Sequence, residues 1–186
     1  MATEQCLGFK SAGIPAGLKK NGAPDLGLIY SETPAAAAAV FTRNLVQAAP
    51  VLLCRQRIQS GRCRAILVNS GNANCCTGPQ GMRDAVAMSA AAAEALGVAE
   101  DQVLVASTGV IGQPLPVTRI EAALPELVQK LAPDGFHLLA RAIMTTDTEP
   151  KLVTRRGAGR RRPYTFVGVA KGAGIIRPDM AAMLCL

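Results

Sequence analysis

Aromatic residues and histidine are scarce in this chain of 186 residues. It has no tryptophan, two tyrosines, four phenylalanines and one histidine. Surfaces that bind single-stranded nucleic acid stack bases on aromatic side chains, so the composition argues against a nucleic-acid partner. The single histidine, His137, stands beside Leu138 and Leu139 without an evident partner for acid-base chemistry, and we expect it to have a structural or surface role.

Long apolar runs and paired cysteines are missing as well. No apolar stretch approaches the roughly 20 residues of a membrane-spanning helix, and the first residues lack the basic and apolar regions of a secretory signal. The six cysteines form no C-x-x-C pair, and one histidine cannot complete a metal site with them. We therefore expect a cytoplasmic protein with no membrane association, no metal and small buried thiols.

The charge is basic and unevenly distributed. Lysine and arginine number 20 against 13 acidic residues, a net charge of +7. Five arginines fall between positions 155 and 162, interleaved with Gly157 and Gly159. This pattern is typical of a solvated turn, and an acidic partner is the alternative. A non-enzymatic basic binding module, with salt-sensitive nucleic-acid affinity, is one function to test against this segment.

Strand-like and helix-like segments alternate along the chain, which predicts a single α/β (α+β) domain over residues 1–186 with layered sheets flanked by helices. The predicted strands are 25–30, 39–42, 64–68, 103–107 and a hairpin of 151–154 with 165–170. The predicted helices are 50–59, 81–96, 118–131, where Pro125 could break the helix, and 136–144.

Polar or glycine-rich turns after apolar strands are the best candidates for chemistry. They are 69–74, 107–112, 144–151 and 170–183. In the second, a hydroxyl residue beside a glycine suits an oxyanion site, although an ordinary capped turn has the same pattern. In the last, Lys171 is either a carboxylate anchor or a solvated lysine, and Gly172 and Gly174 lack the residue order of a phosphate-binding loop.

Taken in order, these segments resemble the ornithine acetyltransferase family, also called glutamate N-acetyltransferase, nearly from end to end. The resemblance lies in N-S-G-N-A-N-C-C-T-G at 69–78, A-S-T-G-V-I-G at 106–112, A-I-M-T-T-D-T-E-P-K at 142–151 and A-K-G-A-G-I-I-R-P-D-M-A at 170–181.

The resemblance implies a self-processing acetyltransferase of the N-terminal-nucleophile type. Such a precursor cuts itself before a threonine into α and β chains that assemble as α2β2, and this sequence would be the α chain, 1–181, with the first β residues, 182–186. The new N-terminal threonine takes acetyl from N-acetylornithine, and in some members from acetyl-CoA, and passes it to glutamate in arginine biosynthesis. Its own amino group can serve as base, and no cofactor is implied.

The same resemblance implies roles for individual residues. Thr108 and Gly109 would form the oxyanion hole, Thr145 and Lys171 would contact the amino-acid substrate, and the scissile bond would join Ala181 to Ala182. Position 182 would be the nucleophile and a substrate contact, but an alanine stands there, and a methyl group can neither cleave the chain nor carry acetyl. We expect this polypeptide to be inactive, whether the alanine is engineered or natural. A related self-cleaving aminopeptidase-type hydrolase is the alternative enzyme.

Overall fold

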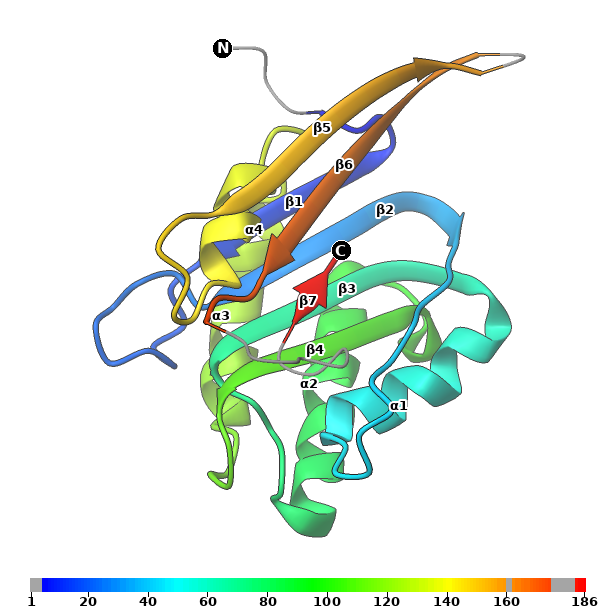
Figure 1. Ribbon diagram of the computed structural model, residues 1–186. Helices are drawn as coiled ribbons and strands as arrows, with labels where there is room; N and C mark the ends of the chain where they lie inside the picture. The colour runs from blue at the N-terminus through cyan, green and yellow to red at the C-terminus, as the bar shows by residue number, and fades with distance from the viewer. Residues whose placement is uncertain (1–4, 160–161, 175–182) are drawn as a thin grey trace.

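A four-stranded sheet forms the centre of the protein. The computed structural model describes residues 5–159, 162–174 and 183–186. The strands are β1 (Phe9–Ile14), β2 (Leu26–Ala36), β3 (Arg62–Asn72) and β4 (Val103–Val110), in the order β1-β2-β3-β4. The first three are antiparallel neighbours, whereas β3 and β4 are parallel and are joined by a helix, as a parallel connection requires. Figure 1 shows this sheet with its strands side by side.

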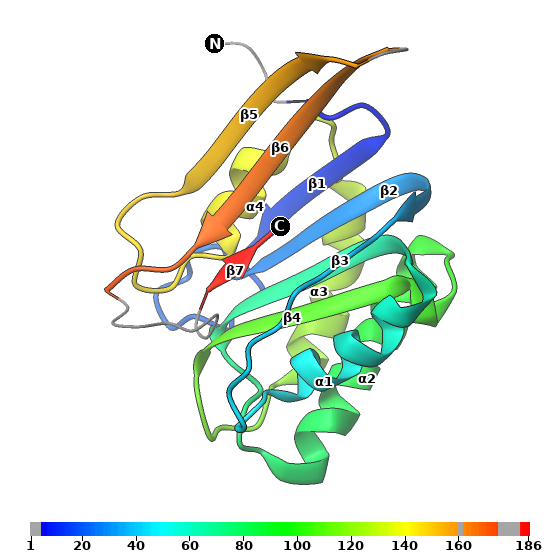
Figure 2. The same ribbon diagram turned by 45° about the vertical axis from the view of Figure 1, so that its right-hand side comes forward.

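Helices cover both faces of this sheet. On one face lie α1 (Ala49–Arg57), α2 (Gly78–Leu96) and α3 (Val117–Gln129), whose apolar residues share a core with Leu26, Leu28 and Leu67. Short 3-10 turns, η1 (Ile58–Ser60) and η2 (Glu100–Gln102), precede β3 and β4. On the other face lies α4 (Phe136–Ala142), which packs with Val68 and with Val169 of a second sheet. In Figure 2, α4 lies between β6 of the second sheet and β1 of the central sheet.

Two glycines allow α4 to approach the central sheet closely. Gly13 and Gly27 pair in register on β1 and β2. A Cβ at Gly13 would lie 2.3 Å from the Leu138 carbonyl oxygen, and one at Gly27 would lie 2.5 Å from Leu139 Cδ1. Any larger side chain would push the helix away from the sheet, so these glycines set the spacing of the layers.

The second sheet has three strands. It consists of β5 (Lys151–Ala158), β6 (Pro163–Lys171) and β7 (Leu184–Cys185), all antiparallel in the order β5-β6-β7. The predicted hairpin is confirmed, with Lys151 opposite Ala170 and Thr154 opposite Val167. Its end at Lys171 brings that residue toward the central sheet.

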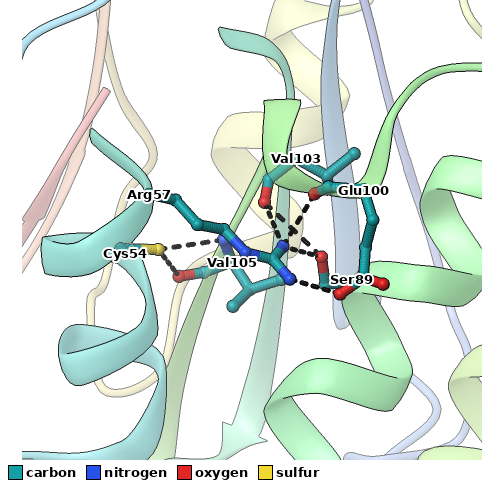
Figure 3. A network of polar contacts seen from close by, with 6 residues as sticks. All are labelled: Cys54, Arg57, Ser89, Glu100, Val103 and Val105. Carbon is teal, nitrogen blue, oxygen red and sulfur yellow. Dashed lines mark hydrogen bonds and ion pairs between the residues drawn. The ribbon is translucent and has the colours of Figure 1, made fainter. Parts of the chain in front are cut away.

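A half-buried polar network joins α1 to β4 (Figure 3). Arg57 donates to the main-chain oxygens of Glu100 and Val103, at 2.9 and 2.7 Å, and also contacts the side chains of Ser89 and Glu100. Cys54 Sγ donates to the Val105 oxygen at 3.0 Å. These bonds fix the start of β4, whose other end carries the candidate site.

Most predicted elements are confirmed, but several boundaries differ. The predicted strand 39–42 is wrong, because β2 ends at Ala36, where β3 begins at Arg62 and no partner strand continues. The predicted turns at 69–74 and 107–112 begin later, since β3 runs to Asn72 and β4 to Val110. Pro125 does not break α3 and lies on its exposed side. Strand β1 was not predicted.

Candidate functional site

The site is built where parallel strands β3 and β4 end. Gly71 and Gly109 are in register, and Gly109 has a positive φ of 136°. A Cβ at Gly109 would lie 2.4 Å from the Gly71 carbonyl carbon and 2.6 Å from the Asn72 nitrogen. Only glycine therefore fits on the side that faces β3. Gly109 is itself exposed, so the other side of its backbone is open to a small molecule.

Lys171 connects the second sheet to this point. Its Nζ donates a hydrogen bond of 2.9 Å to Thr108 Oγ1, and the two residues are 4% and 8% exposed. Burial lowers the pKa of Lys171, the Asp147 carboxylate raises it, and the positive charge of Lys151 lowers it further. A buried ammonium bound to a hydroxyl is thus held at the end of β4.

Asp147 organises the loop between α4 and β5. Its carboxylate accepts from Lys151 Nζ, from the Gly172 main-chain nitrogen at 2.8 Å and from the Thr145 nitrogen at 3.4 Å. Burial alone would raise the pKa of Asp147, but these hydrogen bonds and the Lys151 charge outweigh it and lower the pKa to about 2. Asp147 therefore ties Thr145 to the turn that follows Lys171.

A cavity of about 690 Å³ opens over these residues. The lining includes Thr108, Gly109, Thr145 and Lys171, so the structure brings together four of the predicted site residues. Its wall is completed by Leu18, Lys19, Lys20, Asn21, Gly71, Val110, Gln113, Thr146 and Ala173.

A second cavity, of about 340 Å³, shares Thr108 and Gly109 with the first. Met183 and Leu184 line it, together with Cys75 and Cys76. Thr108 and Gly109 thus stand between two hollows, one of which contains the residue that follows position 182 in the sequence. The predicted cleavage residues Ala181 and Ala182 themselves lie outside the described residues.

The asparagines of the segment 69–74 hold the ends of the two strands together. Asn69 accepts from Ser107 Oγ at 2.6 Å and donates to the Asn72 oxygen at 2.9 Å. Asn72 in turn donates to the main-chain oxygens of Gln113 and Pro114. These buried amides hold the ends of β3 and β4 in position.

Other predictions have mixed outcomes. His137 is exposed, and its ring contacts the Asp134 oxygen at 2.8 Å. The arginine-rich segment 155–162 was predicted as a turn, but its first part belongs to a strand of the hairpin, since β5 reaches Ala158 and β6 begins at Pro163. Cys54 and Cys63 are buried as predicted, but the prediction is wrong for Cys76 and Cys185, which are exposed.

Neither a metal cluster nor a membrane helix is found in the described parts of the chain. No group of three or more His, Cys, Asp or Glu residues could hold an ion there, and none of the helices described is both long and apolar enough to cross a bilayer.

Two features of the site were not predicted from the sequence. Asp147 lies inside a segment that was selected, but its pattern of Thr and Asp before Pro150 is also that of an ordinary turn. Lys19 and Lys20 lie far from the other site residues in sequence, and no motif connects them. An adjacent lysine pair in a loop with Gly17, Gly22 and Pro24 was the only available signal.

Known proteins resemble this chain over nearly its whole length. The ArgJ family profile matches residues 10–186. Two proteins named arginine biosynthesis bifunctional protein ArgJ are similar to this chain. The protein of Geobacter sulfurreducens is 54% identical, and the match covers 95% of this chain and 45% of the relative. The protein of Synechocystis is 52% identical, and the match covers 95% of this chain and 43% of the relative. The chain thus spans less than half the length of these relatives.

Two crystal structures are similar in fold. ArgJ from Bacillus halodurans superposes with a TM-score of 0.90 at 41% identity, covering 97% of this chain and 96% of that one. Ornithine acetyltransferase from Mycobacterium tuberculosis, in complex with ornithine, superposes with a TM-score of 0.88 at 42% identity, covering 96% of each chain. These matches confirm the expected mixed α/β architecture with two sheets flanked by helices.

Proposed function

The chain belongs to the ArgJ family, and on that basis we propose that it is part of an acetyltransferase of arginine biosynthesis that moves acetyl from N-acetylornithine to glutamate. The observation that carries the proposal is the hydrogen bond from Lys171 to Thr108 on the wall of the larger cavity. It places a buried cation and a hydroxyl beside the open backbone of Gly109.

Thr108 and Gly109 are suited to stabilise an oxyanion. Because Thr108 Oγ1 accepts from Lys171, its own hydroxyl proton is available to a group in the cavity, and the ammonium strengthens that donor. The Gly109 amide is the second donor in our proposal. Two donors fixed before the reaction stabilise the negative charge of a tetrahedral intermediate more than that of the neutral acetyl carbonyl.

Lys171 and Thr145 are suited to bind an amino-acid substrate. An ammonium forms its strongest hydrogen bonds with carboxylates, and both proposed substrates carry an α-carboxylate. Asp147 positions this pair, since it binds the main-chain nitrogens of Thr145 and Gly172. The proposed reaction passes acetyl through a side-chain hydroxyl and therefore needs no cofactor, with acetyl-CoA as a further donor.

We place the nucleophile and the cleavage site at position 182, after Ala181. Met183, the next residue, lines a cavity together with Thr108 and Gly109, which supports this placement. In our proposal the family nucleophile is a threonine, so this chain with Ala182 neither cleaves itself nor carries acetyl. The alanine has two explanations, an engineered change or a natural inactive homologue.

We further propose that the segment equivalent to residues 1–181 is an α chain that pairs with a β chain in an α2β2 cytoplasmic enzyme. The match to this chain covers 96% of each crystallised chain, whereas it covers less than half of each full-length relative. This difference supports a family in which the segment exists as a separate chain.

A chimera tests the proposal. Residues 1–186 would replace the matching segment of the Geobacter sulfurreducens relative, once with Ala182 and once with Ala182→Thr. We expect the threonine form to split into two chains by mass spectrometry and to transfer acetyl from N-acetylornithine to glutamate, and the alanine form to do neither. Cleavage of the alanine form, or release of amino acids from peptides without acetyl transfer, would refute the proposal, the latter in favour of an aminopeptidase.

A further inference from the structure

The loop of residues 15–24, between β1 and β2, is held rigidly by one buried carboxylate. Asp25 is fully buried and accepts hydrogen bonds from the main-chain nitrogens of Ala16, Leu18 and Lys19 at 2.6, 2.6 and 2.7 Å. The loop cannot drop these bonds without leaving a buried charge unpaired, which is costly. Its lysines are therefore presented from a fixed backbone.

This loop packs directly against the strand that carries the site. A Cβ at Gly71 would lie 3.2 Å from the Leu18 carbonyl carbon and oxygen and 3.3 Å from Lys19 Cγ. Gly71 is also the register partner of Gly109. The absence of a side chain at Gly71 thus lets the loop sit one strand away from the proposed oxyanion hole.

The cavity between the loop and the site is positively charged. Its described lining contains the side chains of Lys19, Lys20 and Lys171 and no aspartate or glutamate. The carboxylates of Asp25 and Asp147 are engaged by backbone amides and by Lys151. Such a lining favours a ligand with more than one negative charge.

The two loop lysines differ in availability. Lys19 Nζ donates to the Pro24 oxygen at 2.7 Å, so its charge is held in place as part of the loop. Lys20 is exposed, and among the described residues its ammonium has no hydrogen bond or ion pair. Lys20 is therefore the group that can reach a ligand, with Lys19 adding to the local field.

We infer that Lys20 binds the side-chain carboxylate of the acceptor glutamate, while Lys171 binds its α-carboxylate; this inference rests on the proposed function. Glutamate and the acetylated product each carry two carboxylates, which match two separate cations across one cavity. N-acetylornithine carries an ammonium at the end of its side chain, which Lys20 would repel. Lys20 thus discriminates acceptor from donor.

Kinetics of the chimera with Ala182→Thr test this role. Lys20→Gln should raise the KM for glutamate about fivefold, the effect of one exposed charge pair, with kcat little changed. Release of ornithine from N-acetylornithine in the absence of glutamate should be at least as fast as before, because the variant removes a charge that repels the donor. Lys20→Arg should restore most of the affinity, and Lys130→Gln, at an exposed lysine that follows α3 and lies outside the cavity, should have no effect. An unchanged KM for glutamate, or an equal loss for both substrates, would overturn the inference.

A binding measurement on the 186-residue chain keeps the inference separate from the catalytic proposal. Glutarate, a dicarboxylate, should shift the amide NMR signals of the 15–24 loop, whereas butyrate at the same concentration should do so several times more weakly. Lys20→Gln should remove this preference. Equal effects of the two acids on the unaltered chain would overturn the inference even if the chimera transfers acetyl, and a preference for glutarate would support it even if the chimera is inactive.

Discussion

Gly109→Ala is the substitution whose cost follows most directly from the structure. The new Cβ would lie 2.4 Å from the Gly71 carbonyl carbon and 2.6 Å from the Asn72 nitrogen, and both are backbone atoms of a neighbouring strand that cannot rotate away. The residue also has a φ of 136°, which side chains other than hydrogen disfavour. The variant must therefore separate β3 from β4 or change the backbone at the site.

The two penalties can be estimated separately. A non-glycine residue at a positive φ costs about 1–2 kcal/mol, and forcing an extra carbon into a packed region costs about 1–3 kcal/mol. Their sum, about 2–5 kcal/mol, is a large part of the roughly 5–15 kcal/mol that stabilises a typical domain. Gly112→Ala is the matched control, because Gly112 has a φ of 78° but no atom within 4 Å of its would-be Cβ. Gly112→Ala should therefore lose only about 1–2 kcal/mol, the cost of a positive φ at a non-glycine residue.

Urea denaturation followed by circular dichroism measures this difference. With a slope of about 2 kcal/mol per M, Gly109→Ala should lower the midpoint by about 1–2.5 M and Gly112→Ala by less than about 1 M. In the chimera with Ala182→Thr, Gly109→Ala should also slow acetyl transfer, because the proposed donor amide moves. Equal midpoints for the two variants would refute the reasoning, since the contact with β3 would then contribute nothing.

Three further predictions concern other parts of the fold. The lowered pKa of Asp147 should stabilise the protein by about 2 kcal/mol above pH 4, and this contribution should disappear as the pH falls from about 4 toward 2. In urea titrations, the difference in unfolding free energy between the native chain and Asp147→Asn should shrink over that pH range, and a constant difference would contradict the prediction. Arg57→Ala should cost about 2–4 kcal/mol in the same assay, because it removes the guanidinium donor that the buried carbonyl of Val103 and the buried hydroxyl of Ser89 share (Figure 3). A loss below about 1 kcal/mol would show that water replaces the guanidinium. A thiol reagent should label the exposed Cys76 quickly in the native protein and the buried Cys54 only after unfolding, as peptide mass mapping would show. Equal labelling rates would argue against the packing of α1 on β4.

Local patterns predicted much of the secondary structure. The helix that ends at Leu96 is marked by its alanine-rich sequence and by Gly97, which adopts a φ of 64°. The hairpin of β5 and β6 follows from two apolar runs around a turn. The strand predicted at 39–42 failed for a non-local reason: its β-prone residues have no neighbouring strand to bond.

The candidate site was accessible from the sequence only in part. Thr108, Gly109, Thr145 and Lys171 were selected through turns and a family resemblance, and all four line one cavity. Lys20 was missed because it enters that cavity from a loop nearly 90 residues before Thr108, and only the packing of Leu18 and Lys19 on Gly71 places it there.

For this protein, the sequence by itself determined the chemistry that is available: which turns carry hydroxyls, amides and ammonium groups, and that an alanine stands at position 182. Tertiary structure alone decided which of these groups act together. Lys171 at the end of one sheet donates a hydrogen bond to Thr108 at the end of the other, although the two residues are 63 positions apart in the sequence. Burial of Lys171 lowers the pKa of its ammonium. Hydrogen bonds and desolvation depend on distances in space, and those distances follow from how the two sheets pack around α4 and not from any local pattern of residues.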